Sequence, residues 1–211
     1  MDNIIYILFV SISVPILMMT LLLEKKSRLP VLFVLIGIFV SVFVSEVNGL
    51  LAQIIPIGMY NITVIVTPIT EELMKALPIL YFAIVISDKR EQLFTASMAT
   101  GIGFAVLENA YYLLNYPNFT MLSAVIRAFG SGLMHGMCTL LVGMGISFVK
   151  KKRKMFAVGT FGFLSTAIVY HGIYNILIQS KYSLIGALLP IVTYIPFIVW
   201  RVCNRDKQSS N

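Results

Sequence analysis

The sequence predicts an all-α fold, a polytopic membrane helical bundle of seven transmembrane helices that forms a single domain over residues 1–211. Three observations predict this class. Apolar residues make up 58% of the chain and charged residues only 12%, whereas soluble domains are about 45–50% apolar and about a quarter charged. Seven apolar stretches each reach the ~20 residues that cross a bilayer, and the basic residues gather between alternate stretches. This composition excludes a soluble globular domain, a disordered chain and a nucleic-acid-binding module.

The seven expected spans follow one another along the chain with short connections. They are Asn3–Leu23, Val31–Ile55, Ile62–Ser87, Leu93–Leu114, Met121–Val149, Met155–Ile178 and Ser183–Val202. The first span is expected to be retained and not cleaved as a signal peptide, because its positive charges follow the apolar stretch instead of preceding it. Since nearly all residues fall within spans, we expect the protein to act inside the lipid bilayer.

The basic residues set the expected orientation. One set of alternate loops holds 13 of the 16 Lys and Arg residues, whereas the opposite set holds only Lys181. The 13 are Lys25, Lys26, Arg28, Lys89, Arg90, Lys150, Lys151, Lys152, Arg153, Lys154, Arg201, Arg205 and Lys207. Loops rich in Lys and Arg stay in the cytoplasm. The N-terminus is therefore expected outside the cell and the C-terminus inside, in a multi-pass integral membrane protein.

Seven titratable side chains lie where the membrane should reject them. They are Glu46, Glu71, Glu72, Lys75, Glu108, His135 and His171. A charge at the centre of a span costs roughly 2.5–3.5 kcal/mol on insertion scales. Five charged side chains would together cost on the order of 10 kcal/mol, which is comparable to the whole stability of a protein. We therefore expect these residues to pair with one another and to serve a function.

Four of the spans place these groups at a similar depth. At a rise of ~1.5 Å per residue, Glu71 lies ~14 Å below the outer end of the third span and Glu108 ~9 Å below that of the fourth. His171 lies ~11 Å below the outer end of the sixth span, and His135 lies ~12 Å from Arg127, which is expected to reach the outer interface. One shared site requires such a common depth. We therefore expect the side chains to converge and their polar cavity to open outward.

Each of these residues has a polar neighbour three or four residues away, and thus on its own helical face. Glu71 and Glu72 precede Lys75 by four and three residues, so one glutamate can neutralise the lysine and leave the other free. The other pairs are Glu108 with Tyr112, His135 with Thr139 and His171 with Asn175. Glu46 and the nearby Asn48 are expected to hold helices together.

Glutamate and histidine side chains suit hydrolysis in two ways that the sequence leaves open. Glu108, His135 and His171 could ligate one zinc ion while one of the paired glutamates removes a proton from water. Without a metal, a glutamate assisted by a histidine could activate water directly, and His171 and Asn175 would donate to the developing oxyanion. The His-Glu-x-x-His pattern of soluble zinc proteases is absent from the sequence.

Other classes of protein use the same residue types. Intramembrane Glu, Lys and His build proton relays in transporters and channels, and a catalytically inactive scaffold could retain the fold. A transporter needs polar residues that continue to the inner face. The inner halves of the fourth to sixth spans are instead mostly apolar, with small Gly, Ser and Thr residues. This pattern favours a peptidase that cuts a membrane-anchored protein near the outer face.

Four segments in this order, TPITEELMKALP, GFAVLENAYYLL, GLMHGMCTLLVG and VYHGIYNIL, resemble the PrsW family of intramembrane proteases. That family is similar to the wider group of CAAX-processing and bacteriocin-processing membrane enzymes. The resemblance covers a protease-like core at about positions 60–180. The wider group usually has a histidine where this chain has Glu108, which favours the PrsW family.

The resemblance implies roles for single residues. Glu71 and Glu72 are the paired glutamates of the first motif, one activating water and the other paired with Lys75. The residues that complete the catalytic or metal-binding set are Glu108, His135 and His171. Supporting positions are Asn109, Tyr112 and Asn175. Bacterial members of the family resemble first-cut, or site-1, proteases of the cell membrane that sever a single-pass anti-sigma factor on its extracytoplasmic side.

Overall fold

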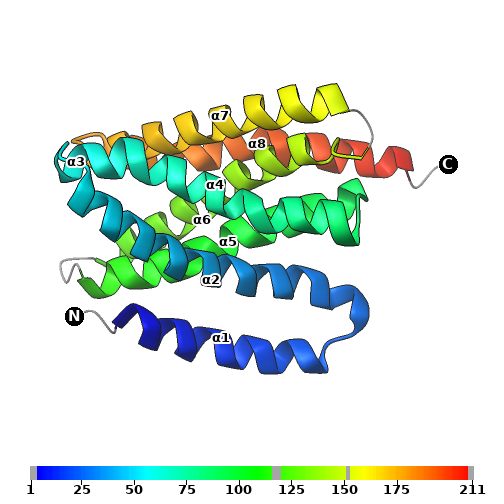
Figure 1. Cartoon of the computed structure of the whole chain (residues 1–211), viewed down its shortest axis with the longest axis horizontal. Helices are drawn as coiled ribbons and strands as arrows, with labels where there is room; N and C mark the ends of the chain where they lie inside the picture. Colours follow the sequence, from blue (N-terminus) through cyan, green and yellow to red (C-terminus); the bar gives the residue numbers. More distant parts are fainter. Residues whose placement is uncertain (1–3, 116–119, 151–152, 209–211) are drawn as a thin grey trace.

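A computed structural model describes residues 4–115, 120–150 and 153–208, and this part of the chain is helical and contains no strand. Six long helices are α1 (Ile4–Leu22), α2 (Lys25–Ile54), α5 (Arg90–Asn115), α6 (Met121–Ile146), α7 (Arg153–Ile178) and α8 (Ser183–Gln208). Figure 1 shows them side by side with their axes roughly aligned; α1 begins at one end of the bundle and α8 finishes at the other. The prediction of an all-helical bundle is confirmed.

The third expected span is a continuous helical run whose hydrogen-bonding pattern changes along its length. It consists of α3 (Met59–Asn61), the π-helix η1 (Ile62–Val66), α4 (Thr67–Tyr81) and the π-helix η2 (Phe82–Ile86). Pro68 is the second residue of α4, where a missing backbone N–H is tolerated. Because π-helical turns hold an extra residue, η1 changes the direction in which the side chains that follow it leave the helix.

Close contact between α5 and α6 depends on a glycine beside the future site. A Cβ atom at Gly101 of α5 would collide with the backbone carbonyl of His135 in α6. Gly37 of α2 has the same relation to the backbone carbonyl of Thr100 in α5. These glycines let three helix backbones approach one another, and their contacts set the rotation of α5 and α6 about their axes.

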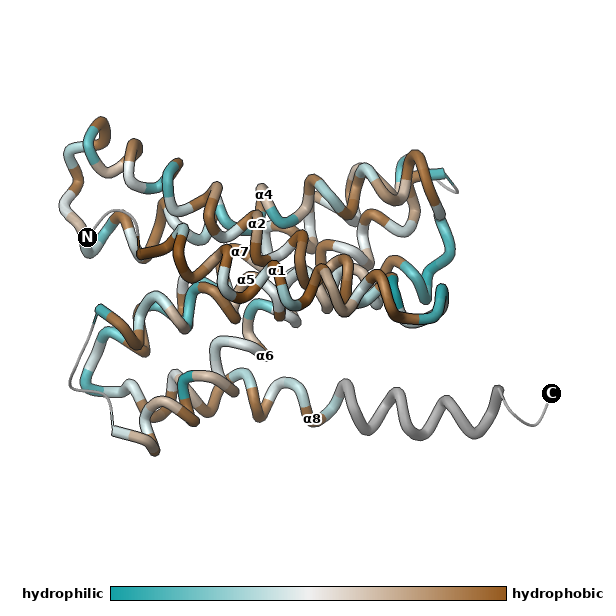
Figure 2. Tube along the Cα trace, turned by 90° about the horizontal axis from the view of Figure 1, so that it is seen from below, coloured by the Kyte–Doolittle hydropathy of each residue, from teal (hydrophilic) through white to brown (hydrophobic). Residues whose placement is uncertain are grey.

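The surface of the bundle suits lipid. Large apolar side chains such as Leu22, Val158 and Phe161 are exposed, and Figure 2 shows hydrophobic stretches along the helices and hydrophilic segments toward the helix ends. Among the described residues, four helices are long and apolar enough to cross a membrane: α1, α2, α6 and α7. The seven spans and the sides of the termini remain predictions. Lys151 and Lys152 of the basic run lie outside the described residues.

Candidate active site

Four helices bring the predicted site residues together in the interior of the bundle. Glu71, Glu72 and Lys75 come from α4, Glu108 from α5, His135 from α6 and His171 from α7. The side chains of Glu72, Lys75 and His135 are fully buried, and those of Glu71 and His171 are buried. The groups that the sequence placed at one depth therefore also meet laterally.

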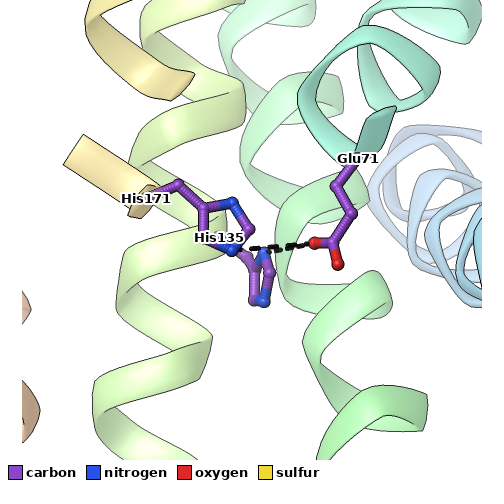
Figure 3. A group of neighbouring side chains, drawn as sticks. All are labelled: Glu71, His135 and His171. Carbon is purple, nitrogen blue, oxygen red and sulfur yellow. Dashed lines mark ion pairs between the residues drawn. The ribbon is translucent and has the colours of Figure 1, made fainter. Parts of the chain in front are cut away.

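Glu71 faces both histidines, as Figure 3 shows. Its Oε2 atom lies 3.8 Å from Nδ1 of His135 and 3.8 Å from Nε2 of His171. One donor atom from each of the three residues lies within 4.8 Å of the others. Among the described residues, Oε2 of Glu71 is a buried atom without a hydrogen-bond partner. The three side chains thus converge on a small volume that can receive a further group.

A second carboxylate holds the far nitrogen of each histidine. Nδ1 of His171 lies 2.9 Å from Oε1 of Glu72, and Nε2 of His135 lies 3.0 Å from Oε2 of Glu108. When these ring nitrogens carry a proton, they donate it to the carboxylates. The other nitrogen of each ring then carries a lone pair, and the ring orientation is held. Nε2 of His171 faces Glu71, whereas Nδ1 of His135 faces both Glu71 and Lys75.

Lys75 supplies the positive charge of the cluster. Its Nζ atom donates to Oε1 of Glu72 at 2.7 Å and lies 3.9 Å from Oε2 of Glu71. The same ammonium group contacts Nδ1 of His135 at 2.8 Å and stands 4.4 Å from the ring centre of Phe104. Glu72 is therefore the carboxylate that pairs closely with the lysine. The Oε2 atoms of both glutamates lack a hydrogen-bond partner among the described residues.

The supporting residues take different positions. Asn175, one turn after His171, donates from Nδ2 to the backbone carbonyl of Thr63 in η1 at 2.9 Å. Tyr112 stacks beneath the guanidinium group of Arg127, 3.9 Å from its ring centre. Asn109 has a buried Oδ1 atom for which the described part of the chain offers no hydrogen-bond partner.

Glu46 and Asn48 join α2 to two other helices, as expected for residues that hold helices together. The hydroxyl of Tyr6 in α1 donates to Oε1 of Glu46 at 2.7 Å. The hydroxyl of Thr70 in α4 donates to Oδ1 of Asn48 at 2.5 Å. Neither residue joins the cluster around Glu71.

Ser131 is a member of the site that the sequence analysis missed. Its hydroxyl donates to Oε2 of Glu108 at 3.2 Å, so this carboxylate is held by two groups from α6. The signal was available, because Ser131 precedes His135 by four residues and so shares its helical face.

A cavity of about 850 Å³ connects the cluster to one end of the bundle. Glu71, Glu108 and Phe104 line its inner part, and Met59 and Gln179 line it near the helix ends. The other walls come from α1, α2, η1, α5, α6 and α7. This is the end at which α1 begins, away from the basic connection around residues 87–91. The cavity therefore extends toward the side that the charge pattern predicts to be outside.

The residues fit a divalent metal ion. Histidine nitrogen and carboxylate oxygen are the ligands that zinc takes in catalytic sites, and Glu71, His135 and His171 offer one such atom each. The sequence left Glu108 with the two histidines as one possible ligand set. The geometry gathers Glu71 with them instead, and Glu108 lies at the far nitrogen of His135. Both histidines thus have the second carboxylate partner typical of zinc ligands.

A comparison with protein families identifies the family of the chain. A model described as PrsW family intramembrane metalloprotease matches residues 25–201. The chain belongs to this family. The match extends from the start of α2 into α8, well beyond the core that the motifs covered, and it confirms the resemblance. No curated protein and no solved structure gives a significant match.

Family membership makes the protein an intramembrane protease, and thus a hydrolase. Its substrate is accordingly a membrane protein in the bilayer. The transporter and scaffold alternatives receive no support from the family match.

Proposed function

We propose that this PrsW-family protease hydrolyses a peptide bond of a single-pass membrane protein inside the cavity, near the extracytoplasmic face, with Glu71, His135 and His171 at the reacting centre. The observation that carries the proposal is the convergence of three donor atoms within 4.8 Å at the inner part of the cavity. A peptide segment that enters the cavity from the helix ends would contact Glu71 and Glu108 in the inner part of the cavity, because both residues line it.

We assign the metal site to Glu71, His135 and His171, with zinc as the ion that this donor set suits best. When bound, zinc supplies Lewis-acid polarisation of the scissile carbonyl and makes water easier to deprotonate. Glu72 and Glu108 hold the histidine rings through their far nitrogens. These two carboxylates can also store a proton that the rings release.

A metal-free mechanism is the second candidate, and one contact favours it. Nζ of Lys75 lies 2.8 Å from Nδ1 of His135, and a single lone pair on that nitrogen serves either the lysine or a metal. In this mechanism Oε2 of Glu71 takes a proton from water. His171, with both ring nitrogens protonated, donates from Nε2 to the oxyanion, and Asn175 donates through its second N–H. Lys75 then compensates the negative charge of Glu72 throughout the reaction.

The substrate and the setting follow from the family resemblance and the charge pattern. We propose an anti-sigma factor as substrate, cut first on the extracytoplasmic side, in the cell membrane of a bacterium. The chain would form one domain of seven spans, with its N-terminus outside and its C-terminus in the cytoplasm. The 13 basic residues on one set of loops support this orientation, as do α1 and α8, which begin and finish at opposite ends of the bundle.

Metal analysis of the purified protein, combined with cleavage in liposomes, tests both mechanisms. For the metal mechanism we expect about one zinc per chain, loss of cleavage of a reconstituted single-span substrate after chelation, and recovery on adding zinc. Glu71→Ala should lose the metal, whereas Glu91→Ala, which changes an exposed glutamate at the far end of α5, should retain it. Cleavage by metal-free protein that is insensitive to chelators would instead establish the second mechanism.

A further inference from the structure

Two unsatisfied hydrogen-bond donors lie on the wall of the cavity, outside the cluster around Glu71. Arg127 of α6 and Tyr174 of α7 both line the cavity. Nε of Arg127 and the hydroxyl of Tyr174 are buried, and no partner for either atom occurs within residues 4–115, 120–150 and 153–208. The Tyr174 side chain is only 3% exposed. Buried donors without an acceptor are costly, so a cavity that presents two of them is suited to an acceptor from outside the protein.

The two donors are neighbours. A Cβ atom at Gly130 would lie 3.5 Å from the hydroxyl oxygen of Tyr174, and Gly130 follows Arg127 by three residues on the same face of α6. Cβ atoms in a helix point toward its N-terminus, which here is the direction of Arg127. Tyr174 also follows His171 by three residues, so it connects the reacting centre with Arg127 along one face of α7.

Arg127 makes no close ion pair with a carboxylate of the described residues, although its charge acts on Glu108, which lines the same cavity. In the described part of the chain, the close ion pairs join Lys75, His135 and His171 to glutamates, and none of them involves Arg127. The guanidinium group instead lies 3.9 Å from the ring centre of Tyr112. An aromatic face compensates a cation only in part. A positive charge on the wall of a cavity inside a membrane protein therefore attracts an anion.

We infer that Arg127 and the Tyr174 hydroxyl form a specificity subsite that binds a carboxylate of the substrate; this inference rests on the proposed function. A carboxylate accepts hydrogen bonds at both oxygens and pairs well with a guanidinium group. Arg127 precedes His135 by eight residues, which is about 12 Å along the helix. An extended substrate advances about 3.3 Å per residue. The carboxylate is therefore expected three or four residues from the cut bond, on the side toward the cavity mouth.

The source of the carboxylate is an acidic side chain or the chain terminus of the substrate, and the test separates the two. The probe is a set of single-span peptides with a randomised outer segment, each made as a free acid and as a C-terminal amide. Purified protein in liposomes cleaves the set, and mass spectrometry maps the cut bonds. We expect Asp and Glu to be enriched three or four residues from the cut, with a preference over Asn and Gln on the order of tenfold.

Substitutions of Arg127 should change this preference in a charge-dependent way. Arg127→Gln should remove it, Arg127→Glu should replace it with a preference for Lys and Arg, and Arg127→Lys should retain it. Tyr174→Phe should weaken it by a smaller factor. Arg90→Glu is the matched control, because Arg90 also stacks on an aromatic ring, 4.9 Å from the ring centre of Phe148, but lies at the other end of the bundle. It should leave the preference unchanged.

Each outcome bears on the subsite. Faster cleavage of the free-acid peptides than of the matching amides, whatever their side chains, assigns the carboxylate to the chain terminus and supports the inference. An acidic preference that survives Arg127→Glu overturns it, and so does an equal loss of cleavage of all peptides in Arg127→Gln. Cleavage by the parent protein without any charge preference overturns the subsite alone. If the parent cleaves no peptide of the set, the proposed function fails and the subsite falls with it.

Discussion

In the half of the bundle next to the connection around residues 87–89, buried hydroxyl groups bond to their own helix. Ser97 donates to the carbonyl of Leu93 at 2.7 Å, and Thr100 donates to that of Ala96 at 2.9 Å. We call this the packed half. In the cavity half, which holds the cluster around Glu71, polar side chains reach across helices, and some of their buried atoms lack a partner among the described residues.

The two halves use similar helices and both bury polar side chains, but with different consequences. A hydroxyl that bonds to the carbonyl four residues earlier needs nothing from a neighbouring helix. A carboxylate or guanidinium group cannot be satisfied in this way and must find a partner elsewhere. The hydroxyl of Thr160, which packs beside Gly145 in the packed half, also lacks a described partner, but it is a neutral group. Buried ionisable side chains with unpaired atoms, more than buried polarity itself, therefore mark the functional half.

The largest effect is expected from removing the carboxylate at the centre of the cavity half. Glu71→Ala should reduce cleavage of a reconstituted single-span substrate by about 10³-fold or more, the range found when a central catalytic group is lost. Expression and thermal unfolding should remain near those of the parent, because the lost Oε2 atom has no hydrogen bond to any described residue. Cleavage at the parent rate would show that the site is wrongly assigned.

The next effect concerns stability in the cavity half. Lys75→Met should lower the free energy of unfolding by about 3–5 kcal/mol, because removing one member of a buried ion pair leaves the other charge unpaired. Here the stranded charge is that of Glu72, which lies 2.7 Å from the lysine. Chemical unfolding in detergent measures the change, with Lys181→Met in an exposed position as control. Equal stability of both variants would contradict the proposed strength of the pair.

A glycine at the border of the two halves should have an intermediate effect. Gly101→Ala forces a methyl group against the backbone of His135, and overpacking of this kind costs about 1–3 kcal/mol. Cleavage should fall as well, because the histidine moves. The control is Gly162→Ala in α7, where an added Cβ meets no described atom within 4 Å; it should be neutral or stabilising by up to about 1 kcal/mol. Similar unfolding curves for the two variants would exclude the close contact.

The smallest effect is expected in the packed half. Thr100→Val removes a buried hydroxyl whose hydrogen bond stays within α5, and intrahelical and interhelical bonds of this type contribute only about 0.6 kcal/mol on average in membrane proteins. Unfolding and cleavage should both stay close to the parent values. A large loss of activity would mean that the packed half contributes to the reaction, and the contrast between the halves would then fail.

The sequence was a good guide to the presence and depth of the site. Glu71, Glu108, His135 and His171 were identified because each is a polar exception in an apolar stretch, and counting residues along a helix gives its depth. The sequence was a poor guide to contacts between helices. It offered Glu108 as a possible metal ligand with the two histidines, whereas the three donor atoms within 4.8 Å of one another come from Glu71, His135 and His171.

Depth was predicted better than contacts because the sequence does not give the rotation of each helix about its own axis. Depth depends on the number of residues from the helix end, but the direction of a side chain depends on how its helix is turned toward its neighbours. The backbone contact at Gly101 and the π-helical segment η1 before α4 both influence that rotation. Neither effect can be calculated from one helix alone. The spacing of Ser131 from His135 and of Tyr174 from His171 is visible in the sequence, but their contacts with groups on other helices depend on this rotation.

The amino-acid sequence by itself determined that the protein is an all-helical membrane protein with acidic and imidazole groups at one depth, because the cost of placing each residue in lipid is a local property. Only the tertiary structure decided which oxygen faces which nitrogen, that Glu72 takes the lysine and leaves Glu71 open, and that Arg127 faces the cavity. Those relations depend on distances of a few ångströms between different helices, and packing of the whole bundle sets them.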